Sequence, residues 1–223
     1  MIQYSILRVI TGVMHILPLN IVRMFRYPFG IVNYIFSIRS TLRLINRKKY
    51  FKNSNIINFS PLMVKIFYAQ YWIEILWLNK KLSVNPEKYV TFDEPKIINR
   101  LVDNNKGFII ALPHQGNWEF AIPAGKSIGL DLVAVAEPLA NKKILDWFIN
   151  LRTLLGCKII VGGSKSNTYD KIKNEILNGK AVCLVSERHI DKSGAPVDFF
   201  GKIAAFPTGP INLAIDTGCP ILP

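Results

Sequence analysis

Acidic residues are absent from the first 73 positions of this 223-residue chain. That segment holds ten Lys and Arg residues and therefore carries +10, whereas the remainder, with 18 basic against 15 acidic residues, carries +3. Such an asymmetry indicates an anionic partner for the N-terminal third. Nucleic acid is the general expectation, but Ile, Leu, Val, Phe and Tyr are interspersed with the basic residues and favour an anionic membrane surface. We therefore expect a membrane partner and no nucleic acid.

The N-terminal segment lacks an apolar run long enough to span a bilayer, which needs about 20 residues. Its uncharged stretches at residues 9–22 and 27–38 are fourteen and twelve residues long. Pro18 and the lack of a small-x-small cleavage site before a polar start argue against a signal peptide. The segment is predicted to form retained interfacial helices whose Arg side chains reach the headgroups. The alternative is a set of helices packed on the protein's own core.

Cysteine is scarce, with three residues (Cys157, Cys183 and Cys219) and no CxxC pair. A disulfide scaffold and a structural zinc site are therefore not expected, and each thiol is predicted to fill a core in a reducing compartment. The chain is 50% hydrophobic, which excludes intrinsic disorder because enough apolar surface can be buried.

The hydrophobic pattern divides the chain into a helical, basic membrane-association region over residues 1–82 and an α/β domain over residues 95–223. In the first region residues 62–78 have aromatic residues at helical spacing, and residues 95–103 form a short helix after a polar break. Four β-branched runs then alternate with helical stretches, which predicts a mainly parallel sheet flanked by helices. The predicted strands cover residues 107–112, 130–136, 157–161 and 181–186, and the helices cover 118–127, 142–155 and 166–177. Residues 207–217 read as another crossover helix, and a further strand starts at Cys219, so we expect a chain truncated at its C-terminus.

His114 is the histidine best placed for chemistry among the three in the chain. It follows the first predicted strand directly, and in such sheets functional groups lie at the carboxyl ends of the strands. Gly116 allows a turn, Asn117 can cap the next helix, and Glu119 can fold back to accept a hydrogen bond from one imidazole nitrogen. The other nitrogen can then take a proton from a substrate hydroxyl, because no Ser or Cys nucleophile adjoins the pair. A capping Glu with a structural His, or a metal site lacking a second well-placed His, remain as alternatives.

The residues from His114 to Glu119, together with several other segments, resemble those of a known family. His114-Gln-Gly-Asn-Trp-Glu119 is similar to the H-x4-D/E motif of glycerolipid-type acyltransferases, in the form found in bacterial lipid A biosynthesis acyltransferases and the related phosphatidylinositol mannoside acyltransferases. Further matches extend from about Arg8 to Pro223: Arg43-Leu-Ile-Asn46, Ala69-Gln-Tyr-Trp-Ile-Glu74, the block from Ser186 to Gly201 that ends in Val-Asp-Phe-Phe-Gly, and Phe206-Pro-Thr-Gly-Pro210.

The resemblance implies transfer of a fatty acyl chain from an acyl carrier protein or coenzyme A thioester to a hydroxyl of a membrane glycolipid. It makes His114 the general base and Glu119 its partner, assigns Asn117, Glu187 and Arg188 to substrate binding, and requires no metal or redox cofactor. Arg188 is a candidate for stabilising the oxyanion or for binding phosphate. The implied fold is the glycerolipid acyltransferase α/β fold, and the implied place is the cytoplasmic face of the inner membrane, as a peripheral or monotopic protein.

Two positions depart from the family pattern. Ala136-Glu-Pro-Leu139 replaces the aromatic-Arg-Pro element of lipid A members and is closer to the Ala-Glu-Arg of the mannoside branch, and Glu187 stands where Asp is usual. A membrane-associated lipid or thioester hydrolase with the same dyad, and an inactive membrane-binding remnant, are the alternative functions. The acceptor sugar and the acyl-chain length are not encoded in a linear motif.

Overall fold

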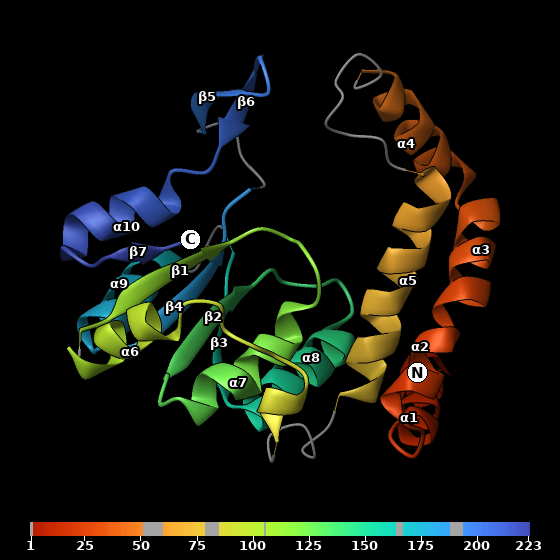
Figure 1. The fold of residues 1–223 in the computed structure, drawn as a ribbon, viewed down its shortest axis with the longest axis horizontal. Coiled ribbons are helices and arrows are strands. Elements are labelled where there is room, and N and C mark those ends of the chain that lie inside the picture. Colours follow the sequence, from red (N-terminus) through yellow and green to blue (C-terminus); the bar gives the residue numbers. More distant parts are fainter. Residues whose placement is uncertain (1, 51–59, 79–84, 105, 164–166, 188–193) are drawn as a thin grey trace. The chain divides into compact units, whose positions relative to one another are not determined.

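The computed structural model describes residues 2–50, 60–78, 85–104, 106–163, 167–187 and 194–223. The chain falls into two compact units, Met1–Leu78 and Asn79–Pro223. The first lies within residues 1–82, for which membrane association is predicted, and the second includes residues 95–223. Figure 1 shows the helices of the first unit and the sheet of the second.

The first unit is helical, as its apolar pattern predicts. Helix α5 packs against α3 most extensively and also contacts α1, α2 and α4. Pro61 occupies the first turn of α5, where its missing N–H leaves no hydrogen bond unmade. The helices are α1 (Ile2–Met14), α2 (Leu19–Met24), α3 (Arg26–Phe36), α4 (Ile38–Tyr50) and α5 (Pro61–Trp77).

A buried polar network links α2 and α3 to α5. Glu74, the first acidic residue of the chain, is buried and accepts hydrogen bonds from Arg23 Nε at 2.6 Å and from Gln70 Nε2 at 2.9 Å. Arg26 Nη1 donates to the side-chain oxygen of Gln70 at 2.6 Å. One carboxylate thus neutralises the charge of Arg23 on the inner side of this basic unit.

Gly30 allows α3 and α5 to approach closely. A Cβ at this position would lie 2.6 Å from the backbone Cα of Ile66, a distance that real Cβ atoms do not adopt. Gly12 in α1, in contrast, has no atom within 4 Å of the corresponding position.

We expect Gly30→Val to lower the free energy of unfolding of the first unit by about 1–3 kcal/mol, because the added atoms force the two helices apart. Gly12→Ala is the matched control and is expected to stabilise α1 slightly, by about 0.5–1 kcal/mol. Thermal unfolding of both variants followed by circular dichroism measures the difference. Equal melting temperatures for the two variants would contradict the close packing of α3 on α5.

The helices of the first unit leave many large apolar side chains exposed. Helix α5 buries several of its side chains, but α1 to α4 and their connections bury few, Met14, Leu19 and Val22 among them. No helix in the described ranges is long and apolar enough to cross a membrane. The exposed side chains on α1 to α4 and their connections are Ile6, Val9, Ile10, Val13, Ile16, Ile21, Met24, Phe25, Tyr27, Phe29, Ile31, Val32, Ile35, Phe36, Ile38 and Leu42.

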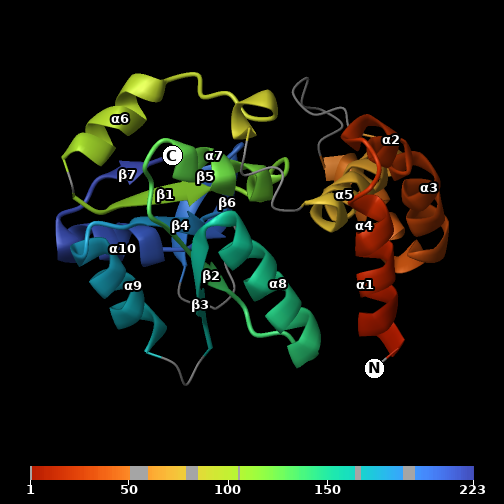
Figure 2. The same cartoon turned by 90° about the horizontal axis from the view of Figure 1, so that it is seen from below.

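The second unit is built on a parallel sheet with strand order β3-β2-β4-β1-β7, which confirms the predicted α/β class with a mainly parallel sheet flanked by helices. Helices α7 and α8 contact each other, as do α9 and α10, and right-handed crossovers place the two pairs on opposite faces (Figure 2). A short 3-10 helix, η3, precedes α7. The strands are β1 (Phe108–Leu112), β2 (Leu132–Ala136), β3 (Cys157–Val161), β4 (Ala181–Val185) and β7 (Ile221–Leu222); the helices are η2 (Pro86–Lys88), α6 (Pro95–Asp103), η3 (Trp118–Phe120), α7 (Ala121–Ser127), α8 (Lys142–Leu155), α9 (Thr168–Leu177) and α10 (Gly209–Thr217).

One cluster of the core of this unit lies between the central strands and the α9–α10 layer. It contains Ile109, Val133 and Val182 from the strands, packed with Ile172 and Ile176 of α9 and Leu213 of α10. The β-branched runs that predicted the strands supply these residues, because a parallel strand is buried on both faces. The core fixes the carboxyl edge of the sheet, where β1 and β4 end side by side.

A two-stranded antiparallel hairpin is an element that the sequence analysis did not predict. It comprises β5 (Ala195–Phe199) and β6 (Lys202–Phe206) and forms a sheet of its own (Figure 1). It connects the region after β4 to α10, and thus follows the same edge of the main sheet as His114.

Candidate active site

The register of β1 and β4 brings His114 and Glu187 together. These parallel neighbours pair Leu112 with Val185, and the backbone N–H of Ser186 donates to the Leu112 carbonyl at 2.9 Å. His114 and Glu187 each follow the last paired residue by two positions. Since adjacent strands lie about 4.8 Å apart, equal offsets place the two side chains beside each other at the carboxyl edge.

The imidazole of His114 is held by a carboxylate and an aromatic ring. Its Nδ1 lies 2.5 Å from Oε1 of Glu187, and its ring meets Trp118 edge-on with centroids 5.1 Å apart. A carboxylate accepts only, so Nδ1 carries the proton and donates it, which leaves Nε2 with its lone pair. The side chains of His114 and Glu187 are 45% and 37% exposed, so the pair is open to a substrate.

The contact with His114 changes the titration of Glu187. Burial raises the pKa of Glu187, but the hydrogen bond from His114 and the backbone N–H groups of both residues lower this pKa more, and the net value is below the ordinary one. The carboxylate therefore stays ionised at neutral pH and can hold the imidazole proton on Nδ1.

Glu119 has a different partner from the one expected. It is fully buried at 0% exposure, and Arg152 of α8 donates to both of its oxygens: Nε at 3.1 and 3.0 Å, and Nη2 to Oε1 at 2.6 Å. In the described part of the chain, the hydrogen bonds of Glu119 and His114 do not join the two side chains. The reason is that η3 directs Glu119 toward α8 in the interior, while the loop after β1 keeps His114 at the surface.

The loop between His114 and Glu119 has the turn and cap predicted for it. Gly116 adopts a positive φ of 63°, which glycine accommodates without strain. The Asn117 side chain accepts a hydrogen bond from the backbone N–H of Glu119 at 3.2 Å, and so caps η3. Asn117 thus shapes the loop that carries His114. Arg188 and His189 lie outside the described residues.

Two contacts of the site, Glu119–Arg152 and His114–Glu187, were not predicted from the sequence. A Glu buried in a first helical turn signals that a cation must lie nearby, but nothing in the sequence identifies Arg152, 33 positions away, as that cation. The pairing of His114 with Glu187 depends on the strand order, in which β4 lies next to β1 although β2 and β3 come between them in the chain.

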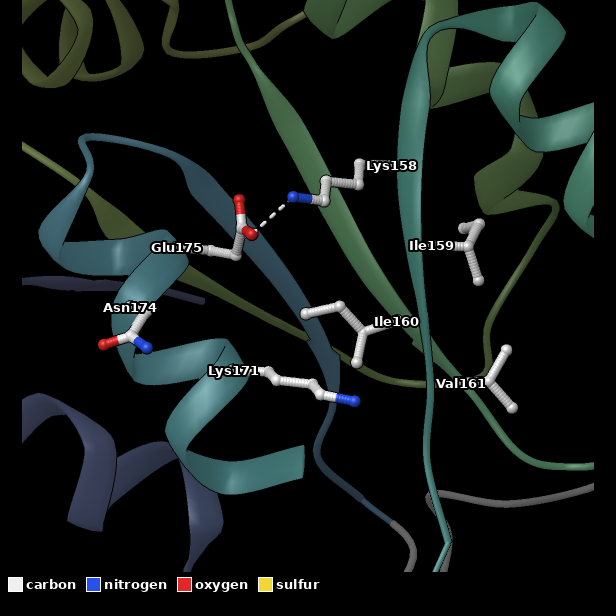
Figure 3. A pocket seen from close by; sticks show the side chains of 7 residues that line it. All are labelled: Lys158, Ile159, Ile160, Val161, Lys171, Asn174 and Glu175. Atoms are coloured by element: carbon white, nitrogen blue, oxygen red, sulfur yellow. Dashed lines mark hydrogen bonds and ion pairs between the residues drawn. The ribbon is translucent and has the colours of Figure 1, made fainter. Parts of the chain in front are cut away.

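A separate groove of about 430 Å³ lies between β3 and α9 (Figure 3). It is lined by Ile160 and Val161 on the strand side and by Lys171 on the helix, with Lys158 and Glu175 forming an ion pair of 2.5 Å across it. No residue of the predicted site lines this groove. Its place at the sheet edge, away from β1 and β4, separates it from His114.

Two of the three cysteines, Cys157 and Cys183, are poor nucleophiles. Burial raises the pKa of Cys157 and of Cys183 to about 12 each, so both remain protonated thiols at neutral pH. Within the described residues, His, Cys, Asp and Glu side chains form no group of three or more that could hold a metal ion.

The family model described as bacterial lipid A biosynthesis acyltransferase matches residues 61–223. The chain belongs to this family. Its match begins at α5 and runs through the whole second unit, so the His114 site lies inside it. The family is one of acyltransferases.

Curated relatives come from mycobacteria. The chain is 30% identical over 168 residues to a phosphatidylinositol mannoside acyltransferase of Mycobacterium tuberculosis, a match that covers 70% of this chain and 50% of the relative. It is 29% identical over 158 residues to the enzyme of the same name from Mycolicibacterium smegmatis, covering 70% and 52%. The chain thus spans about half the length of the curated relatives that it matches.

Proposed function

We propose that this chain carries the catalytic site of an O-acyltransferase that moves a fatty acyl group from a thioester to a hydroxyl of a membrane glycolipid. The observation that carries the proposal is the His114–Glu187 pair at the carboxyl edge of a parallel sheet, in a chain of this acyltransferase family. A lipid A precursor-like or a mannoside-like glycolipid is the acceptor class. The names of the mycobacterial relatives favour the mannoside-like class.

The proton chemistry follows from the hydrogen bond. Nε2 of His114 takes the proton of the acceptor hydroxyl while its oxygen attacks the thioester carbonyl carbon, which gives a tetrahedral oxyanion and an imidazolium. Glu187 stabilises that imidazolium through Nδ1–H. Collapse of the intermediate breaks the C–S bond, and the leaving thiolate receives the proton from Nε2.

Other groups complete the reaction in this proposal. Arg188 has the role inferred from sequence, stabilising the oxyanion or binding a phosphate of donor or acceptor. Acyl carrier protein or coenzyme A carries the acyl group as a co-substrate, and the chain needs no resident cofactor. Glu119 acts on the site through Arg152 and α8 by fixing the position of η3.

Product analysis tests the reaction. The protein is incubated with an acyl thioester, with and without a glycolipid mixture, while free thiol and lipid products are measured by mass spectrometry. We expect thiol release that depends on the acceptor, together with a new ester-linked acyl chain on the glycolipid. Free fatty acid formed at the same rate without acceptor would instead identify a hydrolase.

Replacing Glu187 tests its part in the mechanism. We expect Glu187→Gln to lower kcat by about 10²-fold with little change in KM, because a neutral amide can accept from Nδ1–H but cannot stabilise the imidazolium. Glu175→Gln, which removes a carboxylate from the separate groove, is the control. A kcat for Glu187→Gln within twofold of that for Glu175→Gln would contradict the role of Glu187.

We also propose that helices α1 to α4 lie on an anionic membrane surface at the cytoplasmic face of the inner membrane. The exposed apolar side chains of these helices, interspersed with exposed cations such as Arg8, Arg39 and Arg43, support this placement. Apolar side chains enter the boundary between headgroups and acyl chains, and Arg side chains reach the phosphates.

Vesicle co-sedimentation tests this placement. Binding to vesicles of phosphatidylglycerol is expected to exceed binding to phosphatidylcholine and to weaken in Arg39→Glu/Arg43→Glu, because each basic residue contributes about 1 kcal/mol near an anionic surface. Lys96→Glu, an exposed reversal in the second unit, is the matched control. Equal binding to both lipids and by both variants would overturn the proposal.

A further inference from the structure

We propose that the tip of the β5–β6 hairpin is a second lipid-binding element, which enters the interfacial layer of a bilayer. This inference rests on the proposed function in one respect, since it requires that the chain act at a membrane. It concerns a part of the molecule to which the mechanism above assigns no role.

The hairpin carries large apolar side chains that are not covered by the rest of the chain. Phe200 and Ile203 are 61% and 74% exposed, and Val197 and Phe199 are also exposed. Phe199 stacks edge-on with Phe200, with ring centroids 4.6 Å apart, so the two rings form one apolar tip. Asp198 is exposed as well, and its Oδ1 accepts a hydrogen bond from the backbone N–H of Gly201 at 2.9 Å.

The turn between β5 and β6 contains backbone strain that a different residue pair would avoid. Phe199 pairs with Lys202, so Phe200 and Gly201 are the two loop residues, and their φ angles are 53° and 74°. Two positive φ values are typical of a type I′ turn, for which Asn-Gly is the favoured pair. A bulky aromatic residue in this conformation is strained, and such strain persists where the side chain has a use. Phe200 therefore places an exposed ring at the tip at the expense of turn stability.

A bilayer fits this tip better than a protein partner does. The four exposed side chains offer about 400 Å² of apolar surface at ordinary aromatic and aliphatic areas. That is half of the about 800 Å² that each partner contributes to a standard protein interface. Insertion into lipid needs no complementary surface, and Phe beside Lys202 suits the boundary between acyl chains and headgroups.

The backbone of the hairpin sets how deep the tip can go. Each strand of a two-stranded sheet has an outer edge of unpaired N–H and C=O groups, and these cannot enter the hydrocarbon core. The rings of Phe199 and Phe200 are thus expected at the level of the first acyl carbons, with the strands among the headgroups. Because β5 begins eight residues after Glu187, an insertion of this kind keeps His114 within about 28 Å of the membrane surface.

A tryptophan reporter at the tip tests the inference. The emission of Phe199→Trp, corrected for the native tryptophans by subtracting the parent spectrum, is measured with vesicles of equal phosphatidylglycerol and phosphatidylcholine. We expect a shift to shorter wavelength and stronger quenching by bromine near the carbonyl end of the acyl chain than by bromine near its methyl end. Ile215→Trp, which reports from an exposed position on α10, is expected to show neither.

Phe200→Asn separates binding from folding. The substitution creates the favoured Asn-Gly turn, so we expect an equal or higher melting temperature and about tenfold weaker vesicle partitioning, as loss of one buried ring implies. Unchanged partitioning of Phe200→Asn, or a Phe199→Trp emission like that of Ile215→Trp, would overturn the inference. A blue shift that depends on protein concentration without vesicles would show an interface between copies and would overturn it too. None of these measurements requires catalytic turnover, so a failure of the acyl-transfer proposal can be distinguished from a failure of the lipid-binding inference.

Discussion

Loss of the imidazole in His114→Ala is expected to lower kcat for acyl transfer by about 10²–10⁴-fold, the range for removal of a general base. The expectation follows from the geometry: Glu187 accepts a hydrogen bond from Nδ1–H at 2.5 Å, so Nε2 is the nitrogen that can take the hydroxyl proton. KM for the thioester is expected to change little, since the imidazole acts mainly in the transition state. Steady-state thiol release with saturating acceptor measures both constants.

His15→Gln is the matched control for this experiment. His15 lies in the helical unit, where its Nε2 is 3.1 Å from the Leu78 carbonyl, far in sequence from the catalytic loop. We expect the control to keep kcat within twofold. The far-UV circular dichroism of His114→Ala should match that of the parent, because the His114 side chain is 45% exposed. A His114→Ala protein with parental kcat would refute the proposed mechanism.

The second large effect concerns stability and the Glu119–Arg152 ion pair. Glu119 is fully buried and the Arg152 side chain is 17% exposed, so removal of Glu119 takes from Arg152 the carboxylate that neutralises its charge in the interior. We expect Glu119→Leu to lower the free energy of unfolding by about 3–5 kcal/mol, whereas Glu119→Leu/Arg152→Met regains most of it, because a buried ion pair can often be replaced by apolar residues of similar size. Urea denaturation of the three proteins measures the difference.

Activity of the double variant then distinguishes two roles for Glu119. If Glu119 acts by holding η3 against α8, Glu119→Leu/Arg152→Met should keep a larger share of kcat than His114→Ala does. If Glu119 serves the imidazole directly, the double variant should be as inactive as His114→Ala despite its restored stability. The three hydrogen bonds from Arg152 favour the first outcome.

Elements with local signals could be predicted from the sequence closely. Helix α8 begins and ends at the predicted residues because both ends carry caps: the Asn141 side chain accepts from the N–H groups of Lys143 and Ile144, and Gly156 closes the helix in the left-handed conformation. The strands of the main sheet were predicted from buried β-branched runs. The loop of His114 was predicted from the need for a turn at Gly116 between a strand and a helix.

Elements whose signals are absent, or lie far away in the sequence, could not be predicted. Pro196 lies inside β5 and argues against a strand, and the Phe200-Gly201 turn lacks the Asn-Gly or Asp-Gly signal of a hairpin. The carboxylate partner of His114 depends on which strand lies beside β1, a long-range property of the sheet. The motif places Glu119 close in sequence, but the local direction of η3 buries it against Arg152.

The tautomer of His114 is the measurement that tests the mechanism most directly. In ¹⁵N NMR of protein labelled at histidine, with the His114 signals assigned by their loss in His114→Ala, we expect a protonated Nδ1 and an unprotonated Nε2 at a pH where the ring is neutral. Glu187→Gln should reduce this preference, because the carboxylate that holds the proton is gone. A protonated Nε2 in the parent protein would contradict the account, since that nitrogen could not then accept the proton of the acceptor hydroxyl.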